Sequence, residues 1–360
     1  MKEVPEKRGS RAALLESTKS AEGLGMVMHR GQQISRTTFI AVVLAVLLVT
    51  VLGCWSCSKK AESITIGIMA NAGDTLIFIA DEQKYFTDNG LKVNLKTYDN
   101  GLAATDAMLK GEVDLAYATE FVIVGKTLQK EKIGTITTYS KNEATYLVSR
   151  KDRGIKNIPD LKGKRIGLAL GAITEFYLGR LLDLHGMNIG DVTLVDIKLT
   201  QLGDALLSGD VDAVIAGSRH AYPILQRQQK QVFIWPAQRG QAAYGTLVGK
   251  SDRITRYPEW VKRVLNSLVR AENYVTRYPA EARAAIQKRL NYDDAYMATI
   301  WPEHQFSLSL EQSLITAMED EARWMIKNKL TSERRVPDFL NYIYEDGLKA
   351  IKPEAVNIIR

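Results

Sequence analysis

Cysteine is scarce in this sequence. Among its 360 residues only Cys54 and Cys57 are cysteines, and so few thiols exclude the disulfide framework of a small secreted domain. Only four histidines are present, and no two of them have the His-x-x-x-His spacing of a helical metal site. These residues do not supply the three or four ligands that zinc needs. The sequence therefore predicts neither a metal nor another cofactor.

Motifs of common enzyme classes are missing as well. Gly163-Lys164 lacks the glycine that a phosphate-binding loop carries five positions earlier, because Ile158 stands there. No Gly-x-Ser-x-Gly turn occurs, and no cysteine follows Cys57 to act as a nucleophile in the body of the chain. We find no set of residues with the roles of a catalytic site, and we expect a protein that is not an enzyme.

A stripe of one charge sign is also absent. The formal net charge is +7, yet the residues after position 53 hold 41 basic and 37 acidic groups, mixed in sign along the chain. A nucleic-acid-binding protein usually shows a basic stripe or a known module, so we expect no nucleic-acid partner. A composition of 46% hydrophobic and 25% charged residues is globular, and the length allows two domains or two lobes.

The longest apolar run lies near the N-terminus. Residues 39–53 are almost entirely apolar and follow Arg30 and Arg36. A basic stretch, an apolar core of this length and a small residue at its end are typical of a secretory signal peptide. The run is shorter than the ~18–20 residues of a spanning helix, although an uncleaved single-pass anchor remains the alternative. The predicted signal is preceded by an unusually long leader, and we hypothesise that translation starts at Met26 or Met28.

The end of the apolar run, Val51-Leu52-Gly53-Cys54, resembles the lipobox of bacterial lipoproteins. The resemblance implies cleavage before Cys54 and acylation of its thiol and new amine, which would anchor the chain to a membrane through several acyl chains. We therefore predict a signal peptide over residues 1–53 and a lipid-anchored tether over residues 54–62. The body of the protein would then lie outside the cytoplasm, on the periplasmic or cell-surface side.

The body alternates two periodicities. Apolar residues recur every second position in segments that predict strands, and at helical spacing in the segments between them. This alternation predicts α/β architecture with mostly parallel sheets covered by helices. The predicted strands are 63–69, 91–98, 113–118, 146–149, 165–170, 192–197, 211–216 and 243–249; the predicted helices are 75–90, 102–110, 175–185 and most of the chain after residue 257.

One short pattern occurs twice. Residues 107–114 and 205–212 share the sequence Ala-x-Leu-x-Gly-acid-Val-Asp. In each copy the glycine can take the left-handed position that ends a helix, and the residues after it can turn the chain into a buried strand. Two such copies predict two lobes of similar topology. We place the first lobe at residues 63–145 and 249–360 and the second at residues 146–248.

The body also resembles a known family. The segments 80–86, 89–93, 160–164 and 301–306, in this order with the two repeated turns, are similar to the substrate-binding proteins of nitrate, sulfonate and taurine ABC transporters. That family includes binders of thiamine-pyrimidine precursors. The resemblance implies a two-lobed periplasmic-binding-protein (type II) clamshell with a helical C-terminal region. It further implies a monomer that closes on a small-molecule ligand and docks on an ABC permease with a cytoplasmic ATPase.

The candidate ligand-binding residues follow the predicted strands. In open α/β sheets, ligands bind beyond the carboxyl ends of the strands, where helix N-termini favour an anion. For Asp74, capping of a helix is an equally good interpretation. Residues 171–174 resemble the family's ligand loop, with Ala172 in place of a serine. The predicted site consists of Asn71, Asp74, Thr75, Thr119, Glu120, Ala172, Ile173, Thr174, Gln201, Gly217 and Ser218.

Acidic residues bear on the class of ligand. If Asp74, Glu120 and Glu175 face the cleft, an anion would meet like charges, each costing ~4 kcal/mol at ~4 Å and an effective dielectric constant near 20. We therefore prefer an aminopyrimidine-like heteroaromatic ligand over a sulfonate or nitrate-type anion. The alternative is that Glu175 and Asp74 are helix N-terminal charges that point away. A sensing module for a membrane partner, or an enzyme on the same fold, remain alternative functions.

Overall fold

The computed structural model describes residues 61–360 except residues 229 and 239. The predicted signal peptide, the candidate start residues Met26 and Met28, Cys54 and nearly all of the predicted tether lie outside the described residues. Residues 61–360 belong to one compact unit. Among the described residues, no helix is long and apolar enough to cross a membrane.

The first lobe is built on a six-stranded sheet with the order β11-β4-β10-β3-β1-β2. Strand β1 pairs in parallel with β2 and β3, whereas β10 runs antiparallel to β3 and β4. The strands are β1 (Glu62–Ile68), β2 (Leu91–Thr97), β3 (Leu115–Thr119), β4 (Ile133–Asn142), β10 (Ala243–Lys250) and β11 (His304–Gln305).

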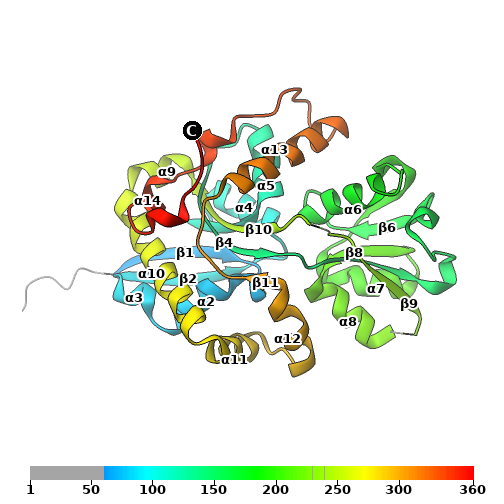
Figure 1. The fold of residues 1–360 in the computed structure, drawn as a ribbon, viewed down its shortest axis with the longest axis horizontal. Helices are drawn as coiled ribbons and strands as arrows, with labels where there is room; N and C mark the ends of the chain where they lie inside the picture. The colour runs from blue at the N-terminus through cyan, green and yellow to red at the C-terminus, as the bar shows by residue number, and fades with distance from the viewer. Residues whose placement is uncertain (1–60, 229, 239) are drawn as a thin grey trace, which may run out of the picture. The chain divides into compact units, whose positions relative to one another are not determined.

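Helices from both ends of the described chain cover this sheet (Figure 1). Helix α10 packs on α2 and α3, and α13 packs on α5. The helices are α2 (Thr75–Glu82), α3 (Tyr85–Asp88), α4 (Gly101–Lys110), α5 (Glu120–Leu128), α9 (Ser251–Arg256), α10 (Pro258–Arg277), α11 (Pro279–Leu290), α12 (Asp294–Ile300), α13 (Gln312–Lys327) and α14 (Asp346–Lys349).

The second lobe repeats this plan with a five-stranded sheet of order β7-β6-β8-β5-β9. Strand β6 pairs in parallel with β7 and β8, and β5 runs antiparallel to β8 and β9. The predicted two-lobed α/β clamshell with a helical C-terminal region is thus confirmed. Its elements are β5 (Thr145–Arg150), β6 (Arg165–Leu168), β7 (Thr193–Asp196), β8 (Ala213–Gly217), β9 (Val232–Pro236), α6 (Ile173–Asp183), α7 (Leu202–Ser208) and α8 (Ser218–Gln228).

The chain crosses between the two sheets twice, from β4 to β5 and from β9 to β10. Strand β10 lies in the first sheet, so residues 243–248, which the sequence analysis placed in the second lobe, belong to the first. Periodicity detects a strand but not the sheet that it joins, because sheet membership depends on pairing with the distant strands β3 and β4. The Gln238 side chain ties the two crossovers together: Oε1 accepts from the Ala144 N–H (3.1 Å), and Nε2 donates to the Asn142 carbonyl (2.8 Å).

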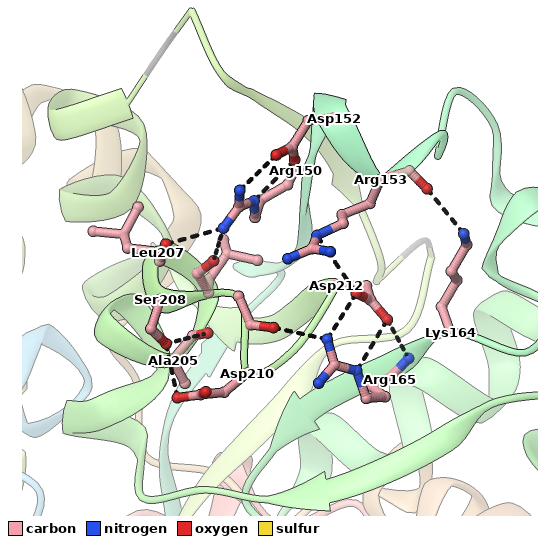
Figure 2. A network of polar contacts seen from close by, with 12 residues as sticks. Arg150, Asp152, Arg153, Lys164, Arg165, Ala205, Leu207, Ser208, Asp210 and Asp212 are labelled. Atoms are coloured by element: carbon pink, nitrogen blue, oxygen red, sulfur yellow. Dashed lines mark hydrogen bonds and ion pairs between the residues drawn. The ribbon is translucent and has the colours of Figure 1, made fainter.

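The repeated sequence pattern forms the same turn in both lobes. Gly111 and Gly209 end α4 and α7 in the left-handed region, each with φ of 84°. The Asp114 carboxylate then accepts from the Thr65 N–H at 2.7 Å, and the Asp212 carboxylate from the Arg165 N–H at 2.9 Å. Figure 2 shows how the second copy is embedded in a network of arginines and aspartates at the start of β6 and β8.

Several predicted elements have different bounds. The helix predicted over residues 75–90 is interrupted at Lys84, which takes the left-handed conformation (φ 61°) between α2 and α3. Strand β6 ends at Leu168, and α6 begins at Ile173 instead of residue 175. The sequence analysis did not predict β4, β9, α5 or α8. Strand β4 is buried over most of its length, and its run of threonines lacks the alternation of a half-exposed strand.

Candidate functional site

A cavity of about 120 Å³ lies between the two lobes, at the carboxyl ends of strands from both sheets. The first lobe contributes residues after β1, β2 and β3 together with residues around α12. The second lobe contributes residues after β6, β7 and β8. The lining residues are Met69, Asn71, Ala72, Gly73, Asn100, Gly101, Tyr117, Thr119, Val122, Asn142, Ala144, Thr145, Ala172, Ile173, Thr174, Leu199, Gly217, Ser218, Arg219, His220, Ala243, Tyr292, Tyr296, Ile300 and His304.

Four helices begin at the cavity wall. Asn100 caps α4 by accepting from the Ala103 N–H at 2.9 Å, and Thr119 is the cap residue of α5. In the second lobe, Ala172 is the cap residue of α6 and Ser218 opens α8. All four of these residues line the cavity. Helix N-termini carry partial positive charge and free N–H groups, so the cavity favours hydrogen-bond acceptors on a ligand.

Two threonines with buried hydroxyls line the cavity from opposite lobes. Thr119 is 8% and Thr174 is 7% exposed, and the Oγ1 of each has no hydrogen-bond partner among the described residues. A buried hydroxyl without a partner costs about 1–3 kcal/mol. The pair is therefore placed to bind a polar solute that touches both lobes.

Aromatic side chains form one wall. Tyr117 comes from β3, Tyr292 precedes α12, and Tyr296 lies within α12. The rings of Tyr292 and Tyr296 form a T-shaped pair with their centroids 4.6 Å apart. Burial lowers the pKa of His220 to about 4, helped by the neighbouring Arg219, and burial also lowers the pKa of His304. Both imidazoles are thus neutral near pH 7 and offer one donor and one acceptor each.

Arg219 is the one lysine, arginine or acidic residue among the described residues that line the cavity. Its Nη1 donates to the main-chain carbonyl of Met69 at 2.6 Å, across the gap between the lobes. The guanidinium is therefore engaged with the protein's own backbone, although it retains further N–H donors.

Seven of the predicted site residues line this cavity. They are Asn71, Thr119, Ala172, Ile173, Thr174, Gly217 and Ser218. Asp74, Thr75, Glu120 and Gln201 do not line it. The Thr75 hydroxyl donates to the Ala72 carbonyl at 2.7 Å, and Gln201 borders a separate groove beside Asp99.

Asp74 shapes the loop before α2. Its carboxylate accepts from the Tyr139 hydroxyl (2.8 Å), the Met69 N–H (3.2 Å) and the Asn71 N–H (3.3 Å). It makes no side-chain bond that caps α2. Burial raises the pKa of Asp74 to about 6, against the lowering effect of these hydrogen bonds. Its position is thus that of a support for the cavity wall.

The other carboxylates also point away from the cavity. Glu120 accepts from the Tyr244 N–H at 2.9 Å, and burial raises the pKa of both Glu120 and its buried neighbour Glu321. Glu175 accepts from the Gly171 N–H at 2.8 Å. The three acidic residues therefore do not oppose an anion in the cavity, and the electrostatic argument against an anionic ligand was wrong. The alternative, that Asp74 and Glu175 are charges near helix starts that do not face the cavity, fits the structure, because neither lines the cavity and both accept from backbone N–H groups of their own loops.

Sequence reasoning missed other lining residues. Asn100 follows β2 and begins α4, so the strand-end rule that found the other residues applies to it as well. Tyr292, Tyr296 and His304 lie in the helical C-terminal region, where no strand end marks the site. The position of α12 beside the gap between the lobes brings the two tyrosines to the cavity, and the pairing of β11 with β4 brings His304 there.

Comparisons with known proteins agree with this architecture. A putative thiamine biosynthesis protein of Haemophilus influenzae is 25% identical over 63% of this chain and 73% of its own length. The formylaminopyrimidine-binding protein of Halalkalibacterium halodurans is 23% identical over 78% and 86%. Further curated relatives are named as putative binding proteins and as 4-amino-5-hydroxymethyl-2-methylpyrimidine phosphate synthases.

Among solved structures, the alkanesulfonate-binding protein SsuA from Xanthomonas axonopodis pv. citri, bound to MOPS, has a TM-score of 0.68. It is 16% identical, with 80% of this chain and 99% of that protein covered, and it shares the fold. The sequence profile described as NMT1/THI5 like matches residues 71–282, which is more than half of the chain. The chain therefore belongs to the NMT1/THI5-like family, within the substrate-binding proteins that its sequence resembles.

Proposed function

We propose that this protein is an extracytoplasmic solute-binding lipoprotein, which captures a small molecule between its lobes and delivers it to an ABC permease. The observation that carries the proposal is the pair Thr119 and Thr174. One threonine comes from each lobe, both line the same cavity, and the buried hydroxyl of each has no partner among the described residues. A solute that bonds to both favours the closed arrangement, because only there are the two hydroxyls within its reach.

We propose an aminopyrimidine-like heteroaromatic as the solute. The cavity of about 120 Å³ suits a single ring, since a cavity of roughly 150 Å³ accommodates benzene. Tyr117, Tyr292 and Tyr296 can contact a ring by edge or face. Asn71 and Asn100 use their amide oxygens to accept from Gly73 and Ala103, so they offer chiefly amide N–H donors for ring nitrogens, and Asn142 adds a further amide. The pyrimidine named for the Halalkalibacterium relative is of this class.

A sulfonate or similar anion is the second candidate. Its support is Arg219 together with the four helix N-termini, which give the cavity positive potential with no carboxylate lining it. The Xanthomonas protein is named as an alkanesulfonate-binding protein and was solved with MOPS bound, so its solute carries such an anionic group. An anion would share the guanidinium with the Met69 carbonyl, whereas a neutral ring leaves that bond in place.

The protein's role ends at binding in this proposal. Anchoring through Cys54, a monomeric state and transfer to a permease with a cytoplasmic ATPase are parts of the same hypothesis. A sensing module for a membrane partner is the alternative, and co-purification with a permease or with a membrane kinase would separate the two. For an enzyme on the same fold, the lining residues within the described part of the chain would have to supply a nucleophile or general base from hydroxyls and two neutral histidines.

Isothermal titration with a formylaminopyrimidine and with taurine tests the solute class. We expect saturable binding of the pyrimidine, weakened about three- to tenfold in Thr119→Val and in Thr174→Val, because each loses one hydrogen bond of ~0.5–1.5 kcal/mol. Thr127→Val is the matched control. Thr127 is a buried threonine of helix α5 in the first lobe, and its hydroxyl also has no partner among the described residues, but it does not line the cavity.

If the protein binds taurine but not the pyrimidine, the solute class is an anion and the pyrimidine proposal is wrong. If the two cavity variants bind either solute as tightly as Thr127→Val and the wild type, the cavity between the lobes is not the binding site. Conversion of the pyrimidine into another compound during the titration, followed by chromatography, would overturn the binding-only role.

A further inference from the structure

The order of strands defines a hinge side and a lip side for the gap between the lobes. The two crossovers leave and enter the sheets at β4 and β10 in the first lobe and at β5 and β9 in the second. Strand β2 is the edge strand farthest from β4 and β10, and β7 is the edge strand farthest from β5 and β9. Residues that follow β2 and β7 therefore lie at the lip (Figure 1 shows the two lobes with the crossovers between them).

Two polar contacts join the lobes, and one of them lies at the lip. Arg219, after β8, donates to the Met69 carbonyl after β1 at 2.6 Å. The Leu199 N–H, after β7, donates to the Asp99 carboxylate after β2 at 3.3 Å. Met69, Leu199 and Arg219 also line the cavity, so the two contacts close its outer edge. Both use protein groups on each side and need no atom of a solute.

The loop that carries the Met69 carbonyl is held in an unusual shape. Ala70 has a φ of 52°, a left-handed conformation that a residue with a side chain rarely adopts. The buried Asp74 carboxylate accepts the N–H groups on both sides of it, from Met69 and Asn71. These bonds fix the peptide whose carbonyl receives Arg219. Strain that is kept in place by a buried carboxylate indicates a functional constraint on this loop.

We propose that Asp99 at the lip and Arg219 nearer the crossovers form a latch, which holds the lobes together through protein contacts alone and so sets how often the empty protein is closed. The contact on the hinge side differs in kind: Glu303 bonds to Tyr146, and its carbonyl accepts from Glu143 of the first crossover. Such a contact lies next to the pivot and changes little as the lobes separate. The Asp99–Leu199 contact joins the loops after the two edge strands, so it has the longest lever arm and is broken by any opening motion. The Arg219–Met69 contact lies nearer the crossovers but also has to break when the lobes separate.

A latch of this kind affects every solute in the same way. The apparent affinity of a protein that binds in its closed form falls with the fraction of closed molecules. Breaking the Asp99–Leu199 contact should therefore weaken all solutes by a common factor, whereas changing a cavity residue, Arg219 included, affects each solute according to its chemistry. This inference concerns the equilibrium between open and closed forms, and it stands whether the solute is a pyrimidine or an anion.

Small-angle X-ray scattering of the purified protein without added solute tests the latch. We expect Arg219→Ala and Asp99→Ala each to increase the radius of gyration relative to the wild type, with a larger increase in the double variant. Arg227→Ala, an exposed arginine on the same helix α8, and Asp204→Ala, an exposed aspartate on α7, are the matched controls and should leave it unchanged.

The two variants remove contacts on different loops, so misfolding of one leaves the other informative, and circular dichroism identifies a misfolded variant. Equal radii of gyration for the wild type, Arg219→Ala and Asp99→Ala would overturn the latch. Because no solute is added, this result is independent of the titrations: a protein that binds neither tested solute can still show the latch. A variant that loses solute binding while its radius of gyration stays unchanged would have a defect in the cavity and not in the latch.

Discussion

Asp74 illustrates how a single residue can support a site without lining it. Its carboxylate is fully buried, bonds to Tyr139 and to two backbone N–H groups, and faces the buried phenols of Tyr139 and Tyr117 with no basic side chain among its hydrogen-bond partners. Burial disfavours the ionised form more than the hydrogen bonds favour it, which is why its pKa rises to about 6.

This shift predicts a pH dependence of stability. A carboxyl with a raised pKa in the folded state stabilises the fold fully below its ordinary value of 3.8 and loses that contribution as the pH rises through about 6. The loss is about 3 kcal/mol in the free energy of unfolding. In Asp74→Asn no proton is released, so we expect a flatter profile than the wild type between pH 4 and pH 7 by about this amount. Urea unfolding at several pH values measures it.

All other carboxyl groups titrate in both proteins, so the difference between the two profiles isolates Asp74. Parallel profiles for the wild type and Asp74→Asn would mean that the carboxylate is ionised in the fold down to its ordinary range.

At the scale of elements, the repeated turn is the clearest example of local sequence that fixes local structure. Gly111 and Gly209 stand at equivalent helix ends with the same φ of 84°. Their surroundings differ: a Cβ at Gly111 would meet only the Lys250 amine at 3.8 Å, whereas a Cβ at Gly209 would collide with the Arg153 guanidinium. Arg153 belongs to the charged network of Figure 2.

We therefore expect Gly111→Ala to lower the free energy of unfolding by about 1–2 kcal/mol, the cost of a left-handed residue with a side chain. Gly209→Ala should cost more, because Arg153 must also move away from Asp212. Gly203→Ala, in the interior of α7 with 3.4 Å of clearance to Ile224, is the control and should be neutral or stabilising. Guanidinium unfolding gives the three values, and equal costs at Gly111 and Gly203 would contradict the turn assignment.

At the scale of the whole described unit, one core connects the lobes. Buried side chains run from the first sheet through α5 and α13 to α6, while the other face of the second sheet has its own cluster under α7 and α8. Trp324 of α13 sits at the junction, with its ring 6.1 Å from that of Phe121 and 5.5 Å from that of Phe176. Gly179 of α6 faces this indole so closely that a Cβ there would overlap its ring.

Gly179→Ala should therefore displace α6 from α13 and change the position of the second lobe. We expect a loss of about 1–3 kcal/mol in the free energy of unfolding, typical of an overpacked core. Affinity for the solute should weaken as well, although no cavity residue has changed. Trp324→Phe in the same chain should restore part of both losses, because the smaller ring leaves room for the methyl group. Thermal unfolding and solute titration of the two single variants and the double variant form a double-mutant cycle. Purely additive effects of the two changes would exclude the contact between residue 179 and the Trp324 ring.

The sequence by itself determined the α/β class, the two lobes and the parts of the site that follow strands. Asn71, Thr119, Thr174 and Ser218 could be found because alternating hydrophobicity locates a strand, and the carboxyl ends of parallel strands share one edge. Both facts depend on near neighbours in the chain. Strand β10 was predicted in the same way, but the sheet that it joins was not.

Only the tertiary structure decided where side chains point and which distant segments meet. It turned the carboxylates of Asp74 and Glu120 away from the cavity, and it brought Tyr292 and Tyr296 of the helical region into its wall. It also joined Arg219 to the Met69 carbonyl, 150 positions away in sequence. The physical reason is that the orientation of a charged or aromatic side chain follows from the cost of burial against all its neighbours, and most of those neighbours are far away along the chain.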